Sequence, residues 1–405
     1  MDNVTHSLAA ILVAEAVCEN RKPAPDPARF RTAALWVSLI ANNLPDLDFL
    51  YRKITPGKLG YLLHHRGYSH TFVVAPALAA LAVVLVLGAA RLRGVRFAAR
   101  DVRALVGLAV FGSFLHIAMD FQNNYGVHPF WPFDDRWYYG DFLFIVEPLL
   151  WAFAVVVIAS VARTMVASVG VVAVFAAALA YGMVAGAVPA REIVGLLFVA
   201  ACVAVAARST SRRGRVWLGV AGWLSVTGGF LLASRAALNA VTASAVRVFP
   251  EMRLVDVIRT PSMGNPVCWS VIALGTEGDR YVARRSVVSL APSALPPRRC
   301  GARDPRAVTA PLGAIETVDG GVLWRSEFVA PLAELRALAR THCDAAAFLR
   351  YSRAPFWVDA SGSVMGDLRF DRSRALDFAK VTLSESAACP PHVPPWTPPR
   401  EDLLE

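Results

Sequence analysis

The chain of 405 residues contains 56% hydrophobic and only 18% charged residues, with a mean hydropathy of +0.46. A soluble protein has about a quarter charged residues, so the composition excludes an ordinary cytosolic enzyme. Lys and Arg number 41 against 31 Asp and Glu, which gives a formal charge of +10. Because much of this excess falls in short loops between apolar segments, we expect it to set membrane orientation, and we expect no nucleic-acid partner.

Long apolar runs before about Arg235 indicate a membrane domain, since a spanning helix needs about twenty mostly apolar residues. Candidate spans lie at Ala33–Leu50, His70–Ala90, Val102–Met119, Phe142–Val161, Val166–Val188, Ile193–Ala207 and Val216–Ser234. Thr5–Val17 is either an eighth span or a helix that only enters the outer leaflet. The predicted fold is a mainly α, polytopic bundle of seven or eight spans over residues 1–235, followed by a small soluble α+β domain over residues 236–405.

Basic residues are unequally divided between alternate loops: one set of loops has fourteen Lys and Arg residues and the opposite set has six. Cytoplasmic loops of membrane proteins carry such an excess of basic residues, so the richer set of loops is expected on the cytoplasmic side of the membrane. Met1-Asp2-Asn3 lacks the basic start of a signal peptide, so we expect the first apolar stretch to be retained. With eight spans, Met1 and the tail domain are both expected outside the cell membrane.

The tail domain contains Cys268, Cys300, Cys343 and Cys389. These cysteines form either two disulfides, in any of three pairings, or four free thiols if the domain is cytosolic. Strand-like runs lie at Leu254–Arg259, Val267–Leu274, Tyr281–Val288 and Phe356–Val358, and helical patterns lie at Leu332–Ala339 and Asp344–Tyr351. The Pro-rich end around Trp396 is expected to be extended. We expect the tail to cover the membrane domain or bind a partner, without an activity of its own.

Ionisable groups gather at the ends of the first four apolar runs, where they are costly and usually mark a functional site. The groups are His6, then Asp46 and Asp48, then His64, His65, Arg66 and His70, then His116 and Asp120. Consecutive spans alternate in direction, so all four groups are predicted on the same outer face of the membrane. This agreement favours one shared site.

The spacing within these groups is suited to a metal site. His116 and Asp120 are four residues apart and therefore share one helix face. Asp46 and Asp48 flank a helix end at Pro45. Histidine and carboxylate are the ligands of zinc and related divalent ions, and their number allows two ions bridged by one Asp. The alternative for any single residue is a helix cap or an interfacial group.

Four stretches carry a family resemblance: MDNVTHSL, NLPDLD, HHRGYSH and HIAMDFQNNYG. Over roughly residues 1–147 the chain resembles the YdjM-like family of inner-membrane, metal-dependent hydrolases. The resemblance implies a membrane-bound hydrolase with phospholipase-like activity. A looser likeness to bacterial zinc phospholipases C implies that His6, Asp46, His70, His116 and Asp120 are metal ligands, although the HxxxE motif of those enzymes is missing here.

Five further residues are candidate catalytic groups. Asp48, His64 and His65 are additional ligands or acid/base groups. Arg66 either binds a phosphate in a bidentate manner or is a positive residue flanking a span. Glu147 is either a ligand or general base, or it pairs with Arg66 or Arg136. Ten aromatic residues between Phe121 and Phe144 are typical of a membrane interface, which places the site beside lipid headgroups.

The sequence thus favours a membrane-bound metal-dependent hydrolase that acts on a phosphoester, with a membrane lipid as substrate. A transporter of metal ions or protons that uses the same His/Asp cluster is the alternative. Such a transporter requires polar groups in the other half of the membrane, which the last three spans lack. A scaffold whose tail binds a protein partner is a third possibility.

Overall fold

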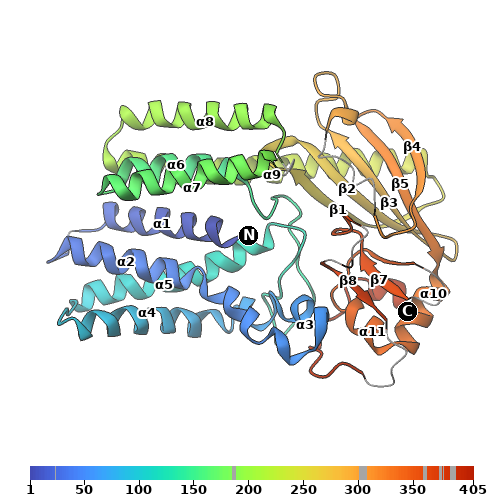
Figure 1. The fold of residues 1–405 in the computed structure, drawn as a ribbon, viewed down its shortest axis with the longest axis horizontal. Helices are drawn as coiled ribbons and strands as arrows, with labels where there is room; N and C mark the ends of the chain where they lie inside the picture. Colours follow the sequence, from blue (N-terminus) through green and yellow to red (C-terminus); the bar gives the residue numbers. More distant parts are fainter. Residues whose placement is uncertain are drawn as a thin grey trace.

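The computed structural model describes residues 1–22, 24–184, 188–300, 308–358, 363–373, 376, 378–383 and 389–405. A helical bundle forms one half of the molecule and a sheet-containing tail forms the other (Figure 1). The α-helices are α1 (Asn3–Asn20), α2 (Pro27–Ala41), α3 (Gly57–His64), α4 (Ala75–Leu92), α5 (Ala99–Phe121), α6 (Pro148–Val161), α7 (Met165–Val184), α8 (Ala190–Arg208), α9 (Arg212–Val248), α10 (Leu332–Thr341), α11 (Cys343–Leu349) and α12 (Glu401–Leu404). The 3-10 helices are η1 (Leu44–Leu50), η2 (Arg52–Ile54), η3 (Tyr68–His70) and η4 (Pro297–Arg299).

Helices α1, α2 and α4 to α9 lie side by side in the bundle (Figure 1). Among the described residues, five of them, α4, α5, α7, α8 and α9, are long and apolar enough to cross a membrane. Helix α6 is apolar but shorter, α2 has only 15 residues, and α1 carries His6, Glu15 and Glu19, which lower its hydropathy. The membrane character of the chain is therefore confirmed, whereas the predicted count of seven or eight spans is not.

Two predicted spans differ from the helices that form. The run Ala33–Leu50 does not continue as one helix, because α2 ends at Ala41 and η1 follows. Pro45 lacks a backbone N–H and favours this break. His70 does not open the third long helix either, since it lies in η3, five residues before α4 begins. Both differences place the polar groups on short irregular segments beside the bundle.

Charged residues inside the bundle are paired. Glu15 of α1 is buried and forms ion pairs with Arg31 of α2 and Arg212 of α9. Arg21 and Asp101 make a further pair, with 2.6 Å between guanidinium nitrogen and carboxylate oxygen. An unpaired charge in an apolar environment is costly, so each of these charges is held beside its partner. The pairs thereby connect the ends of four helices.

Helix α9 joins the bundle to the tail. Its 37 residues span about 55 Å at 1.5 Å per residue, well beyond the roughly 30 Å of a hydrocarbon layer. The expected domain boundary at residue 235 falls inside this helix, and its second half lies against the large sheet (Figure 1). Trp324 is fully buried there, and its indole N–H donates to the Ser244 hydroxyl at 2.9 Å. The bundle and the sheet therefore share one apolar core.

The tail contains two antiparallel sheets. The larger has the order β1-β2-β3-β5-β4 and the smaller β6-β7-β8. The strands are β1 (Arg253–Ser262), β2 (Asn265–Glu277), β3 (Arg280–Ser289), β4 (Gly313–Asp319), β5 (Val322–Pro331), β6 (Pro355–Trp357), β7 (Val364–Asp367) and β8 (Lys380–Thr382). The structure contains each strand and helix expected in the tail, and β4, β5, β7, β8 and α12 in addition. Two disulfides form, Cys268–Cys300 and Cys343–Cys389.

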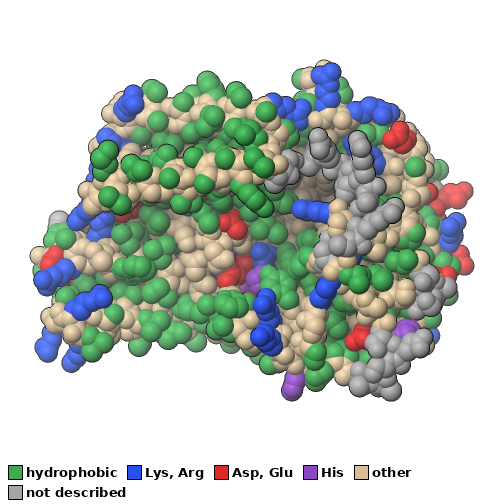
Figure 2. Space-filling view, in the orientation of Figure 1, with side chains coloured by type: hydrophobic (Ala, Val, Ile, Leu, Met, Phe, Trp, Pro, Cys, Tyr) green, Lys and Arg blue, Asp and Glu red, His purple; other side chains and the backbone are tan. Residues whose placement is uncertain are grey.

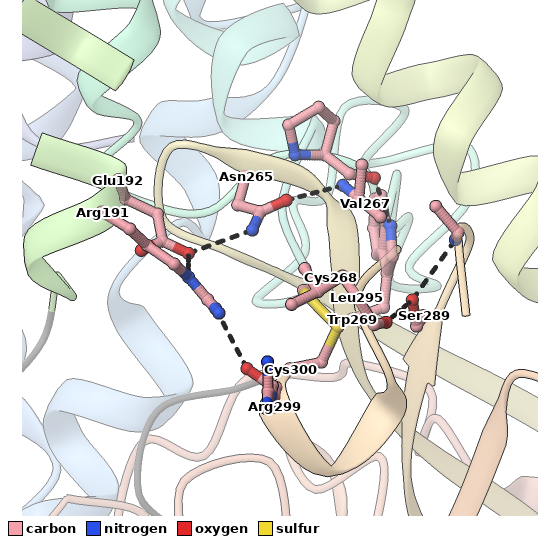
Figure 3. The surroundings of a disulfide bond; sticks show 12 residues. Arg191, Glu192, Asn265, Val267, Cys268, Trp269, Ser289, Leu295, Arg299 and Cys300 are labelled. Carbon is pink, nitrogen blue, oxygen red and sulfur yellow. Dashed lines mark hydrogen bonds and ion pairs between the residues drawn. A yellow bond between two sulfur atoms is a disulfide. The ribbon is translucent and has the colours of Figure 1, made fainter. Parts of the chain in front are cut away.

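The turn between β1 and β2 docks the large sheet onto the bundle. The Asn265 side-chain amide donates to Glu192 at the start of α8, and Arg191 donates to the carbonyl of Arg299, next to a disulfide (Figure 3). The backbone N–H of Gly264 donates to the Glu147 carboxylate at 3.2 Å. Gly264 has a φ of +69°, which favours glycine at this turn.

The Pro-rich end of the tail returns to the bundle. Trp396 is fully buried, its indole N–H donates to the Leu63 carbonyl at 2.7 Å, and its ring stacks on His128. The ring also limits the space at Gly67, where a Cβ would lie 3.1 Å from it. The tail thus covers the segment that carries His64, His65 and Arg66, as the sequence led us to expect.

Helix α9 offers a matched pair of glycines for testing the bundle packing. A Cβ at Gly222 would lie 2.0 Å from the Phe153 ring, whereas a Cβ at Gly228 meets nothing within 4 Å. We predict that Gly222→Ala lowers stability by about 1–3 kcal/mol through overpacking. Gly228→Ala should raise stability slightly, because Ala favours helix by up to about 1 kcal/mol. Thermal unfolding in detergent measures both, and equal melting temperatures would contradict the predicted α6–α9 contact.

Candidate metal centre

Four of the predicted ligands converge at the end of the bundle that faces the tail. Asp46 lies on η1, His70 on η3, and His116 and Asp120 on the last turns of α5. One ligand atom of each residue lies within 4.8 Å of every other. Figure 2 shows acidic and histidine side chains at this boundary, between the apolar bundle and the tail. Helices that alternate in direction have brought distant segments to one place, as the spacing of the polar groups predicted.

The distances suit a single ion. His70 Nε2 lies 3.0 Å from His116 Nε2 and 3.1 Å from Asp120 Oδ2. The carboxylate of Asp46 lies 3.5 Å and 3.6 Å from the same two histidine nitrogens. Ligands at 2.0–2.2 Å around a tetrahedral ion are about 3.4 Å apart. The four atoms therefore match the corners of one metal coordination sphere.

The hydrogen bonds on the far side of each imidazole orient its free nitrogen toward this point. His116 Nδ1 lies 2.9 Å from the Asn42 carbonyl, which only accepts, so Nδ1 carries the proton. His70 Nδ1 faces Ser69 Oγ at 3.0 Å and the Asp48 carboxylate at 3.4 Å. Both Nε2 atoms then present lone pairs. The two histidine nitrogens and the two carboxylate oxygens are then all acceptors, and none of them has a proton to donate to another. Such a set of residues fits a bound cation.

The protonation states agree with metal binding. Burial lowers the pKa of His70 to about 4, although the neighbouring Asp46 carboxylate raises it, so the imidazole is neutral at pH 7. Burial raises the pKa of Asp46, but the neighbouring imidazoles of His116 and His70 lower it more, and the carboxylate is ionised. Neutral imidazole and ionised carboxylate are the forms that bind metals.

His6, the fifth predicted ligand, lies beside the cluster. Its Nε2 is 3.3 Å from Asp120 Oδ1, and its ring stacks on that of His116 with 3.9 Å between centroids. Asp120 Oδ1 also accepts from Arg66 at 2.9 Å and contacts the amine of Met1. A second ion bridged by Asp120 would have to share this oxygen with two cationic groups, and it stays a prediction.

Asp48 and Arg66 support the cluster from behind. The Asp48 carboxylate accepts from the Arg66 backbone N–H at 2.8 Å and from His65 Nδ1 at 3.0 Å, in addition to facing His70. Arg66 has a φ of +60°, and its buried guanidinium donates to Asp120 and, at 2.9 Å, to Asn123. A non-glycine residue in this conformation is kept there by its surroundings, often at functional sites.

The remaining candidates differ in position. His65 stacks on Tyr61 and lines the pocket beside the cluster. His64 is bound to Thr55 at 2.8 Å, under the tail. Glu147 caps α6 by accepting from Leu149 and Gly264. The expected pairing of Glu147 with Arg66 or Arg136 is wrong, because Arg66 binds Asp120 and Arg136 binds Asp134.

A pocket of about 610 Å³ opens next to Asp46. Asp46 is the only one of the four clustered ligands with exposed surface, 14% of its side chain, so the site is reached from its side. Its lining is mixed: it contains polar residues such as His65 and Arg66 and apolar residues such as Phe49 and Ile145. The tail supplies Phe370, Arg372 and Phe378 to its wall. These three residues carried no sequence signal, because only the docking of the tail brings them here.

The comparisons bear on the part of the chain that holds these ligands. Residues 1–191 match the family described as YdjM inner membrane protein. The resemblance that the motifs indicated is confirmed, and the matched stretch contains the whole cluster together with α1 to α7. No curated protein and no solved structure matched the chain. The likeness to zinc phospholipases C stays a prediction.

A matched pair of histidines tests the metal site. We predict that His116→Ala loses more than half of the bound metal, because it removes a ligand nitrogen. His64→Ala should retain the wild-type content, since His64 is also buried at a helix end but is bound to Thr55. Elemental analysis of detergent-purified protein measures the metal. Equal content in the two variants, or a smaller loss in His116→Ala, would count against the assignment.

We predict that the buried carboxyl group of Glu147 makes the stability of the folded protein depend on pH. Burial raises its pKa from 4.5 to about 8, although the N–H groups of Leu149 and Gly264 lower it. The native state therefore favours the neutral acid. This stabilisation is complete below pH 4.5 and disappears as the pH rises through 8. Relative to Glu147→Gln, wild type should become less stable by a few kcal/mol between pH 5 and pH 8.5. Unfolding of both proteins across this range measures the difference, and parallel profiles would refute it.

Proposed function

We propose that this protein is a membrane-bound, metal-dependent hydrolase that cleaves a lipid phosphoester at the extracytoplasmic surface of the inner membrane. The observation that carries the proposal is the convergence of four metal-binding atoms beside a pocket that has both polar and apolar lining residues. The pocket lies beside the end of the apolar helix bundle, and we expect that end to emerge from the bilayer. A lipid phosphoester has the same arrangement of a polar, anionic group next to hydrocarbon, so the pocket and the substrate class are complementary.

The mixed lining of the pocket suits a lipid entering from the membrane. Ile145 and Val146 precede α6, and Phe49 lies near the end of η1, so these apolar residues lie where the two helices begin or end. Arg66 also lines the pocket. A phosphoester bound beside Arg66 and Asp46 would present its phosphorus to the cluster, with its acyl chains against the apolar residues.

The chemistry follows from the residues around the cluster. A divalent ion such as zinc supplies Lewis acidity and a nucleophile derived from water at neutral pH. Arg66, held by Asp120 and Asn123, stabilises negative charge on the phosphoryl oxygens. His65 lies in the pocket wall with its Nδ1 bound to Asp48, and as an imidazolium it would carry on its other nitrogen the proton that passes to the leaving group.

Two features support an outer location for the active site. Cys268–Cys300 and Cys343–Cys389 pair within the tail, and disulfides persist in oxidising compartments. The loops at the opposite end of the bundle carry the larger number of basic residues, as cytoplasmic loops do. Both observations support an extracytoplasmic position for the tail and the metal cluster.

Hydrolysis of bis(p-nitrophenyl) phosphate by detergent-purified protein tests the activity. We predict that wild type releases p-nitrophenol, that a chelator abolishes the reaction, and that zinc restores it. The His65→Gln variant should retain its metal, but its hydrolysis rate on esters with poor leaving groups should fall about 100-fold or more. Its rate on bis(p-nitrophenyl) phosphate should fall less, because the p-nitrophenolate leaving group departs without a proton.

Fully metal-loaded protein that releases no product would contradict the proposal. Metal flux into sealed vesicles without hydrolysis would instead favour the transporter alternative. His64→Ala serves as the matched control for substitution of a buried histidine, and its rate should equal that of wild type.

A further inference from the structure

A second cavity, of about 380 Å³, lies between the large sheet and the bundle. This volume falls within the range of about 300–1,000 Å³ that is usual for ligand pockets. Its floor comes from strands β1, β2, β3 and β5, and one wall comes from Pro189, Arg191 and Glu192 at the start of α8. Because α8 is long and apolar enough to cross a membrane, we expect the cavity at its start to lie near the depth of the lipid headgroups.

The two cavities adjoin. Phe144 and Arg372 line both of them, and the Arg372 guanidinium lies 5.9 Å from the centre of the Phe144 ring. The two cavities are therefore neighbours, and a substrate that fills both would have to pass these two residues. Arg372 comes from the tail and Phe144 from the loop before α6, so the docked tail brings the two cavities together.

The lining of the second cavity is rich in hydrogen-bonding groups. Four hydroxyl side chains line it, those of Thr260, Ser262, Ser270 and Ser286. The Ser286 side chain is 3% exposed, and its hydroxyl has no hydrogen-bond partner among the described residues. One carboxylate oxygen of Glu192 is also buried without a hydrogen-bond partner among the described residues. Buried polar atoms usually have partners, so these two point to a polar ligand that donates and accepts hydrogen bonds.

The charges of the lining disfavour a cationic ligand. Five arginines line the cavity, against the two carboxylates of Glu192 and Asp371. Arg191 already binds Glu192, and Lys380 binds Asp371. A quaternary ammonium group donates no hydrogen bond, so it would leave the free oxygen of Glu192 without a donor, and it would meet five guanidinium groups against two carboxylates that already have cationic partners. Hydroxyl groups, in contrast, can use both the serine oxygens and the arginine N–H groups.

We propose that this second cavity holds the headgroup of the substrate, and that the substrate is a lipid phosphodiester with a polyol headgroup such as glycerol or a sugar. The inference rests on the proposed hydrolase function for its catalytic part, because it assigns the phosphoester to the metal pocket. The headgroup site itself depends only on the cavity and its hydroxyl and arginine lining.

The catalytic test compares two lipids with equal acyl chains, dioctanoyl phosphatidylglycerol and dioctanoyl phosphatidylcholine, with bis(p-nitrophenyl) phosphate as a substrate that lacks a headgroup. We predict that wild type prefers the glycerol lipid by at least tenfold. Ser286→Ala should reduce this preference about three- to tenfold, the value of one neutral hydrogen bond. Ser270→Trp should abolish the preference by filling the cavity, since Ser270 is an exposed position on its floor. Both variants should keep the wild-type rate on the chromogenic ester.

Two substitutions on the same sheet serve as controls. Ser326→Ala on β5 and Val318→Trp on β4 change positions that do not line either cavity, and the Val318 side chain is exposed. Both should behave as wild type in every assay. An equal rate on the two lipids, or an unchanged preference in Ser270→Trp, would overturn the headgroup assignment.

Binding without catalysis separates this inference from the hydrolase itself. In chelator-treated protein, saturation-transfer NMR should detect glycerol 1-phosphate and show at least a fivefold weaker signal for phosphocholine. Ser270→Trp should remove the glycerol phosphate signal. If the chromogenic ester is not cleaved but this pattern appears, the hydrolase proposal fails and the headgroup site stands. If the ester is cleaved and both probes bind equally or not at all, the headgroup site is refuted.

Discussion

Two histidine nitrogens and two carboxylate oxygens occupy one small space at the edge of the membrane bundle, and all four present lone pairs to it. Without a cation these atoms repel one another in an environment that screens charge poorly. The fold nevertheless holds them there through contacts on their far sides: the Asn42 carbonyl orients His116, and Asp48 orients His70. Asn3 donates to the Asp46 carboxylate at 2.9 Å. The ligand geometry therefore depends on an outer layer of hydrogen bonds as much as on the ligands themselves.

The tail has a structural and a chemical part in this arrangement. Helix α9 runs from the bundle into the sheet without interruption, so the two halves share one core and do not act as separate units joined by a linker. Trp396 fixes the far end of the tail over the histidine segment. Through these attachments the tail contributes Arg372 and two phenylalanines to the pocket beside Asp46. The family match ends at residue 191, yet residues far beyond it complete the cavity that a substrate would enter.

Long apolar runs in the first half of the chain, and strand-like runs and helical patterns in the tail, predicted much of this fold. His116 and Asp120 share a helix face because they are four residues apart, a relation that needs no tertiary information. Strands β1, β2 and β3 lie where the strand-like runs were expected. The run Ala33–Leu50 misled the prediction, because apolar composition continues through η1 while the backbone geometry changes at Pro45. The length of helix α9 was underestimated, because its second half packs on a sheet and is less apolar than a membrane span.

The sequence by itself determined the membrane character of the chain, the ligand types and the end of the bundle at which they gather, since hydropathy, residue chemistry and the alternation of helix direction are properties of local segments. Only the tertiary structure decided that Asp46, His70, His116 and Asp120 meet within 4.8 Å while His64 binds Thr55. It also decided which cysteines pair and that a second cavity adjoins the first. The physical reason is that these relations join residues separated by tens to hundreds of positions, and their distances are set by packing of whole helices and sheets, which no local pattern encodes.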